Sequence, residues 1–253
     1  MFRLTSRGAG MPQNNIDEEL VDAASAGDWE KVLKLLACGA NPRSGVSAAL
    51  WCGVNPGSGV SAALWCAAIA GSVECVRALL PVSDPKANES YALVLAAQNG
   101  HAECVKLLLP VSDAKSKNSC ALRLAALEGS SECVRLLLAS SDPTENDSEA
   151  LRWAAELGRV ECIRLLLPAC KPLFELVGIL KQVVGSGSAT AAALLISEEP
   201  RLLDGVDLCQ CVVEAIEKGH LDMASLLSSI MDKQELLSIA PNIPKGGLGP
   251  ARL

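Results

Sequence analysis

The chain carries the stretch ALVLAAQNGHAECVKLLL at residues 92–109, and close copies follow as ALRLAALEGSSECVRLLL at 121–138 and ALRWAAELGRVECIRLLL at 150–167. Apolar residues recur three and four positions apart on either side of a glycine, a pattern typical of two short helices joined by a turn. Successive copies begin 29 residues apart. Because a fixed period of this length is the signature of stacked helical units, the sequence predicts an all-α repeat solenoid.

The period continues where the sequence letters diverge. Adding 29 to Gly158 reaches Gly187, and weaker copies surround Gly27 and Gly219. We therefore predict about seven units over residues 16–240. The flanking segments 1–15 and 241–253 are expected to be disordered, because they fall outside the periodic pattern.

Local signals set the expected helix ends within each unit. The turn glycine is suited to the left-handed conformation that commonly follows a helix. One serine precedes each central first helix, and serine is a favoured N-cap, so we predict that these hydroxyls cap the helices. The serines concerned are Ser61, Ser90, Ser119 and Ser148.

A direct duplication interrupts the period near the N-terminus. The sequence NPRSGVSAALWCGV at 41–54 is followed by NPGSGVSAALWCAA at 55–68. The second copy runs in register into Gly71, so the 14 residues at 41–54 are surplus. Two interpretations stay open: a loop that bulges out, or a segment that occupies the repeat position itself.

Composition excludes several functional classes. The net charge of −7 and the pI of about 5.0 argue against a nucleic-acid binder, which normally has a basic face. No apolar stretch reaches the ~18 residues that a membrane span needs. The 11 cysteines form no disulfide-like framework, so we expect reduced thiols and a cytoplasmic location, with the nucleus as the alternative.

The cysteines and histidines offer little chemistry. Cys75, Cys104, Cys133 and Cys162 occupy one repeat position. Packed helices lie about 8–10 Å apart, beyond the ~7 Å that a disulfide spans, so these cysteines are expected to be small buried residues. Structural zinc requires paired ligand motifs, and only Cys209-Gln-Cys211 approaches one. We expect no metal, no cofactor and no catalysis; a redox protein using Cys209 and Cys211 is the enzymatic alternative.

The run from Ala96 to His101, Ala-Ala-x-x-Gly-His followed by the leucines, resembles ankyrin repeats over roughly 16–240. The family unit is typically 33 residues and contains a β-turn finger and a Thr-Pro-Leu-His tetrad. This chain has 29-residue units without that tetrad. The resemblance therefore implies an ankyrin-like fold whose fingers are reduced to tight loops, with any remaining β structure in question.

The resemblance also implies where a partner would bind. Ankyrin-like proteins use the concave surface made by the first helices and the loops before them. Positions outside the repeating pattern are expected to face outward there, and Trp, Tyr and Arg are common interface anchors. The predicted partner-binding residues are Tyr91, Leu95, Asn99, Arg123, Leu124, Glu128, Arg152, Trp153 and Glu156. An alternative for Trp153 is that it fills a gap between helices.

The predicted function is thus a non-catalytic scaffold that binds another protein. We expect a monomer without a nucleic-acid or membrane partner. The alternative is a substrate-recruiting adaptor or effector that delivers a bound target to an enzyme, which would need a docking segment outside the repeats. Glu and Lys or Arg recur three apart on the second helices and are expected to form a solvated outer face.

Overall fold

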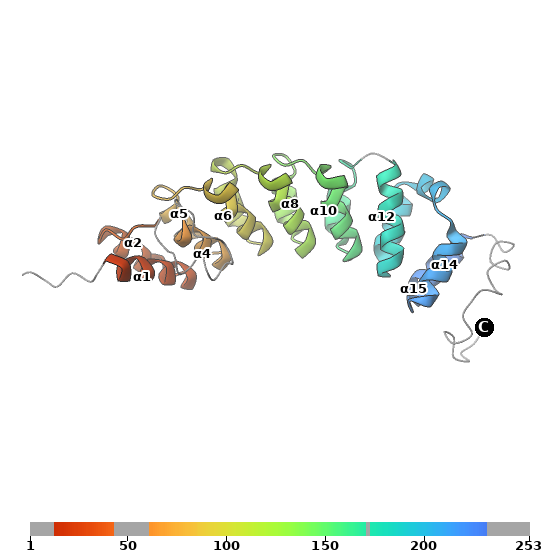
Figure 1. Ribbon diagram of the computed structural model, residues 1–253, viewed down its shortest axis with the longest axis horizontal. Coiled ribbons are helices and arrows are strands. Elements are labelled where there is room, and N and C mark those ends of the chain that lie inside the picture. The colour runs from red at the N-terminus through yellow and green to blue at the C-terminus, as the bar shows by residue number, and fades with distance from the viewer. Residues whose placement is uncertain (1–12, 43–60, 171–172, 232–253) are drawn as a thin grey trace, which may run out of the picture. The chain divides into compact units, whose positions relative to one another are not determined.

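The computed structural model describes residues 13–42, 61–170 and 173–231, and the helices there form seven consecutive pairs (Figure 1). The first helices are α1 (Gln13–Ala26), α4 (Ala62–Ala70), α6 (Ala87–Gln98), α8 (Ser116–Glu128), α10 (Glu145–Glu156), α12 (Leu173–Ser186) and α14 (Leu208–Glu217). The second helices are α2 (Trp29–Ala37), α5 (Val73–Leu79), α7 (Ala102–Leu108), α9 (Ser131–Leu137), α11 (Val160–Leu166), α13 (Ala189–Glu198) and α15 (Leu221–Ile230). Two 3₁₀ segments, η1 (Leu109–Val111) and η2 (Pro200–Gly205), follow α7 and α13, and no strand occurs among the described residues.

The described helices match the all-α class, while the predicted repeat boundaries at 16 and 240 stay a prediction. Helix α1 begins at Gln13, three residues before the predicted boundary of the repeats. The predicted tail at 241–253 and most of the surplus segment at 41–54 lie outside the described residues.

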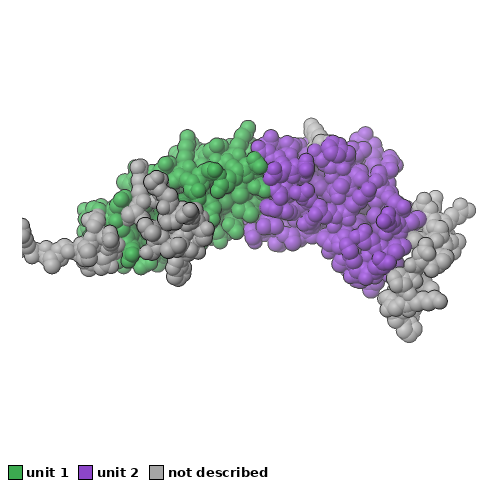
Figure 2. All heavy atoms as spheres, in the orientation of Figure 1, with its two compact units in different colours: residues 1–125, 139–141 green, residues 126–138, 142–253 purple. Residues whose placement is uncertain are grey.

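The described residues divide into two compact units (Figure 2). Unit 1 runs to Ala125 and includes Ala139–Ser141, and unit 2 comprises Ala126–Leu138 and the residues from Asp142 onward. The boundary falls within α8, so most of this helix belongs to unit 1.

The repeating residues form the core. In the α6–α7 pair of unit 1, Ala96 and Ala97 of the first helix are fully buried, as are Cys104, Val105 and Leu108 of the second. The small alanines allow adjacent first helices to approach closely, and α6 contacts α4 as well as α7. Complete burial of each Val or Leu side chain stabilises the fold by about 1.5–3 kcal/mol, and it requires a neighbouring repeat on each side.

The turn glycine touches the following repeat. Gly71 has a φ of +69°, and a Cβ added there would lie 2.5 Å from Nδ1 of His101. The other ring nitrogen of His101, Nε2, lies 2.8 Å from the carbonyl oxygen of Ile69. In unit 2, Gly187 meets His220 in the same way. The glycine is thus needed twice, for its left-handed backbone and for the space that the next repeat's side chain occupies.

At Ser61, Ser90 and Ser148 the predicted serine caps are wrong, because these hydroxyls bond to the next repeat instead. Ser61 makes no capping bond; its Oγ accepts from the Asp84 amide at 2.9 Å and donates to the Asp84 carbonyl at 3.2 Å. The Oγ of Ser90 accepts from the Asp113 amide at 2.7 Å. In unit 2, the Ser148 Oγ donates to Glu175 Oε2 at 2.7 Å. These serines are buried, so packing against the next loop outweighs local capping.

A left-handed turn stands where three of the four caps were expected, at Ser90, Ser119 and Ser148. Three successive non-glycine residues have a positive φ at the starts of α6, α8 and α10. They are residues 88–90, 117–119 and 146–148, again 29 apart. Left-handed residues other than glycine cost roughly 1–2 kcal/mol each, and Asn is the best tolerated of them. An Asn is present in every one of the three turns.

Side-chain bonds join the shortened loops. The Oγ of Ser112 donates to the Pro85 carbonyl at 3.4 Å, and Ser141 repeats the bond to Ala114 at 3.3 Å. In unit 2, the thiol of Cys170 reaches the Pro143 carbonyl at 3.6 Å. Each donor follows its acceptor by 27 residues. Together with the buried serines, these bonds connect consecutive loops without any β pairing in the described part of the chain.

We expect Gly71→Ala to lower the free energy of unfolding by about 2–3 kcal/mol. The substitution combines a left-handed alanine with a clash against His101. Gly39→Ala is the matched control, because Gly39 has a φ of +88° but nothing lies within 4 Å of its added Cβ. Urea denaturation should show Gly39→Ala costing only about 1 kcal/mol; equal losses for the two variants would contradict the packing argument.

We expect Ser90→Ala to destabilise the protein by about 1–3 kcal/mol, because the Asp113 amide would lose its buried acceptor. Ser225→Ala removes an exposed hydroxyl in α15 and should stay within about 0.5 kcal/mol of the parent. Thermal and urea unfolding would check both variants. If Ser90→Ala is as stable as Ser225→Ala, the bond between repeats does not contribute to stability.

Candidate partner-binding surface

Tyr91 lies in an aromatic and charged cluster of unit 1. Its ring meets that of the buried Trp65 edge-on, with the centroids 5.1 Å apart. The Nζ of Lys117 lies 5.8 Å from the Tyr91 centroid and 3.3 Å from Glu89 Oε2. Half-buried Tyr91 is therefore held from both sides and presents a pre-ordered aromatic edge.

Arg123 supports the left-handed turn at the start of α8. Its Nε donates to the Asn118 carbonyl at 3.0 Å and its Nη2 to the Lys117 carbonyl at 3.1 Å. Through these bonds the guanidinium fixes the backbone that carries Lys117 beside Tyr91. The structure thus brings together two of the predicted residues, Tyr91 and Arg123, by way of Lys117, which sequence reasoning missed.

The other predicted residues of unit 1 differ in accessibility. Leu124 is half-buried and Asn99 is exposed, with its Nδ2 donating to the Leu95 carbonyl at 2.8 Å. Leu95 itself is only 6 % exposed, so the expectation that its side chain faces outward is wrong. Leu95 was expected to face outward because its position varies between repeats. In α6 this position is nevertheless packed inside the protein.

In unit 2, four predicted residues remain accessible. Arg152 is half-buried, with its Nη2 3.7 Å from Glu149 Oε1. Trp153 and Glu156 are half-buried in α10, and Glu128 is exposed at the end of α8. Trp153 thus keeps part of its ring accessible while the rest packs, which lies between the two interpretations made from the sequence.

Two accessible apolar residues of unit 2 lie outside the predicted partner-binding set. Leu157, directly after α10, is 50 % exposed, and Phe174 in the first turn of α12 is 76 % exposed. Leu157 departs from the repeat pattern, because the corresponding positions in the two preceding repeats are the polar Asn99 and Glu128. Phe174 lies in a repeat whose sequence diverges from the others, so the repeat pattern did not indicate its exposure.

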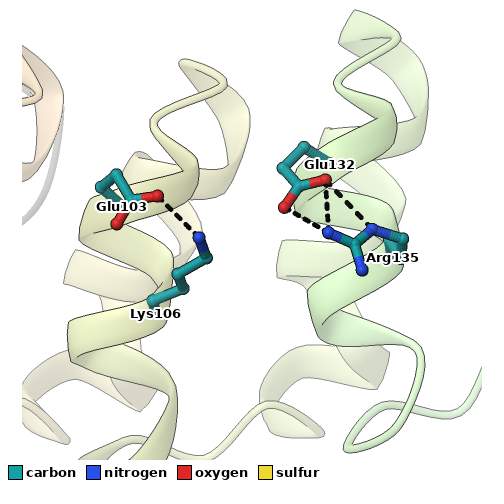
Figure 3. Close-up of polar contacts among 4 residues, drawn as sticks. All are labelled: Glu103, Lys106, Glu132 and Arg135. Atoms are coloured by element: carbon teal, nitrogen blue, oxygen red, sulfur yellow. Dashed lines mark hydrogen bonds and ion pairs between the residues drawn. The ribbon is translucent and has the colours of Figure 1, made fainter.

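The second helices carry ion pairs within single helices (Figure 3). In α7 the Nζ of Lys106 lies 2.6 Å from Glu103, and in α9 the Nη2 of Arg135 lies 2.6 Å from Glu132. A looser pair, at 3.9 Å, joins Arg164 and Glu161 in α11. These side chains are largely exposed, as expected, and such pairs contribute only a few tenths of a kcal/mol each.

Comparison with known proteins matches this geometry. A family model described as "Ankyrin repeats (3 copies)" matches residues 20–119 and 93–174, more than half of the chain. The chain belongs to the ankyrin-repeat family. The human ASB11 ankyrin repeat domain, a crystal structure, is similar at a TM-score of 0.61 and 20 % identity, over 84 % of this chain and 97 % of that one. No curated protein sequence matches significantly.

Ankyrin repeats are generally protein–protein interaction modules, and the described residues have helix pairs like those of the family but no β fingers. In the described part of the chain, no helix combines the length and apolar character needed to cross a bilayer. Among the same residues, no three His, Cys, Asp or Glu side chains are grouped so that they could hold a metal ion.

The cysteines that share one position of the second helices, Cys75, Cys104, Cys133 and Cys162, are buried. Burial raises the pKa of the Cys104 thiol to about 11, with smaller contributions from Glu74 and Glu103. Burial likewise raises the pKa of Cys162 to about 11. The pKa of Cys211 is also raised, first by burial and then by Glu214. These shifts oppose thiolate formation, so they disfavour the redox interpretation at Cys211.

We expect stability to fall between pH 9 and 11 because of Cys104 and Cys162. The unfolded chain loses these protons near the ordinary pKa of 9.0, whereas the folded chain holds them to about 11. Stability present below pH 9 is therefore lost as pH rises, on the order of 2 kcal/mol per thiol.

Urea denaturation of the parent and of Cys104→Ala/Cys162→Ala across this range would measure the effect. The double variant should show the flatter pH dependence, while Cys38→Ala, which changes an exposed thiol, should follow the parent. Parallel curves for the parent and the double variant would disprove the assignment.

Proposed function

We propose that this chain is a non-catalytic scaffold that binds a partner protein through the exposed face of its first helices. The carrying observation is that residue types favoured at interfaces occupy accessible positions of these helices outside the repeat pattern. Tyr91, Arg123, Arg152 and Trp153 are each half-buried, so they are partly ordered yet still available for contact.

The described histidines support a structural role. The Nε2 atoms of His101 and His220 lie 2.8 and 3.3 Å from the backbone carbonyls of Ile69 and Gly185. Each ring also covers the turn glycine of the preceding repeat. Rings committed to repeat packing are poorly placed to act as general bases, which supports the non-catalytic proposal.

Unit 2 provides the sharpest test of the surface. We expect the double variant Arg152→Ala/Trp153→Ala to lower partner capture by chemical crosslinking from native lysate at least tenfold. Truncation of an anchoring Trp or Arg typically costs 1–2 kcal/mol or more. Arg152→Ala alone should show a smaller loss, and it leaves the packing of Trp153 intact.

Trp29→Ala/Arg135→Ala is the matched control. It removes an exposed tryptophan of α2 and an exposed arginine of α9, outside the predicted surface. Circular dichroism and thermal melts would confirm that all variants remain folded. Unchanged capture by folded Arg152→Ala/Trp153→Ala, or an equal loss in the control, would refute the proposed surface.

A further inference from the structure

Negative charge is concentrated on one repeat of unit 2. The stretch from the loop aspartate to the end of the first helix can be compared across three consecutive repeats. Residues 84–99 contain two acidic and one basic residue, and residues 113–128 contain two acidic and three basic residues. Residues 142–157 contain five acidic residues and one arginine. The α10 repeat therefore differs from its neighbours in charge although it shares their fold.

Three of the carboxylates in this part of unit 2 are accessible and form no ion pair among the residues that the structure describes. Glu128 and Asp147 are exposed and Glu156 is half-buried. Arg152 faces Glu149, whereas Arg159, which donates from Nε to the Leu127 carbonyl at 3.2 Å, keeps its positive charge near Glu128. The three carboxylates outnumber this arginine, so the net charge of the surface is negative.

Exposed apolar side chains accompany the carboxylates. Leu157 directly follows Glu156, and the bond from Arg159 to Leu127 holds this turn against the end of α8 that carries Glu128. Phe174 has the largest exposed fraction, 76 %, of the large exposed hydrophobic residues in the described chain.

The first turn of α12, which carries Phe174, is bonded to the left-handed turn that carries Asp147. Glu175, the next residue after Phe174, accepts a hydrogen bond from Ser148, the neighbour of Asp147. One turn later, Gly178 has no side chain, and nothing lies within 4 Å of where its Cβ would be. The surface of α12 at Gly178 is therefore open, with room for an apolar group of a partner.

We propose that this surface of unit 2, named here the acidic face, binds a cationic amphipathic segment of the partner protein. The acidic face consists of Glu128, Asp147, Glu156, Leu157 and Phe174. The inference rests on the proposed function and specifies the chemistry of the partner. Leu157 and Phe174 supply apolar contact, while the carboxylates steer Lys and Arg toward the face and repel acidic segments.

The spacing of the two apolar residues sets the length of the segment. The turn at Ser148, linked to Glu175, and Leu157 are nine residues apart, a distance on the order of 14 Å at about 1.5 Å per helical residue. A partner helix would reach both with apolar residues about seven or eleven positions apart, because those spacings keep two side chains on one face of a helix, and with basic residues between them. A 14-residue peptide is long enough to span this distance.

Three synthetic 14-residue peptides test the chemistry on the full chain by fluorescence anisotropy. One combines Leu with Lys in a helical amphipathic pattern, the second replaces Lys by Glu, and the third replaces Leu by Ser. We expect the Leu/Lys peptide to bind at least tenfold more tightly than either of the others and to weaken at high salt. Equal binding of the Leu/Glu peptide would overturn the charge assignment, and equal binding of the Lys/Ser peptide would overturn the apolar one.

Variants test the location. Glu128→Gln/Asp147→Asn/Glu156→Gln should weaken the Leu/Lys peptide about tenfold, and Leu157→Ser/Phe174→Ser should do the same. The charge control, Glu103→Gln/Glu132→Gln/Glu161→Gln, removes the same charge from second helices. The apolar control, Leu221→Ser, changes a 54 % exposed leucine of α15 in unit 2. Both controls should change the affinity less than twofold.

The outcomes separate the two proposals. If the controls weaken the peptide as much as the acidic-face variants, or if neither set has an effect, the acidic face is not the site. If the acidic face is not the site but partner capture still depends on Arg152 and Trp153, only the inferred chemistry of the partner is wrong. If partner capture does not depend on Arg152 and Trp153 either, the proposed function is also wrong.

Discussion

The close approach of a repeat to the turn glycine of the previous one, present in both compact units, is the constraint on which the structure depends. Each helix pair is too short to bury its apolar stripe alone, so stability requires contact with the next pair. At Gly71 that contact is with His101, and at Gly158 it is with Ser188. The side chain differs, yet the missing Cβ is used in the same way. This contact sets the spacing of the first helices and thereby the positions of the residues that they expose.

Serine hydrogen bonds take over the joining of loops that β fingers provide in longer ankyrin units. Ser61 and Ser90 bond to the following loop, while Ser112 and Ser141 bond to the preceding one. Because these bonds are made inside the protein, removing one partner leaves a buried polar group unsatisfied, which costs more than an exposed bond would. The loops can therefore be short without being loose, and recognition shifts toward the first helices.

The repeat, its helices and the buried cysteines could be predicted from the sequence, because periodicity reports directly on packing. The left-handed turns could not, since residues such as Glu89 and Lys117 have no intrinsic preference for that conformation and adopt it only in the stacked structure. The serine caps failed for a related reason: a hydroxyl next to a helix start has a local and a distant partner, and sequence spacing reveals only the local one. At the candidate surface, positions that vary between repeats were predicted to face outward. Arg152 and Trp153 are accessible, whereas Leu95 is buried by its neighbours.

The loop bonds also bear on how such a chain can change length during evolution. Ser112 and Ser141 each donate a hydrogen bond to a carbonyl 27 residues earlier in the chain. Ser61 and Ser90 each accept a hydrogen bond from an amide 23 residues later. Both separations are shorter than one period and recur with it. Adding or deleting a whole 29-residue unit therefore leaves every donor facing an equivalent acceptor, whereas a partial insertion between two partners separates them along the chain. The 14-residue duplication at 41–54 separates none of these bonded pairs, and within the region that they span selection should favour gain and loss of complete repeats. The recognition residues of each new unit would be free to diverge.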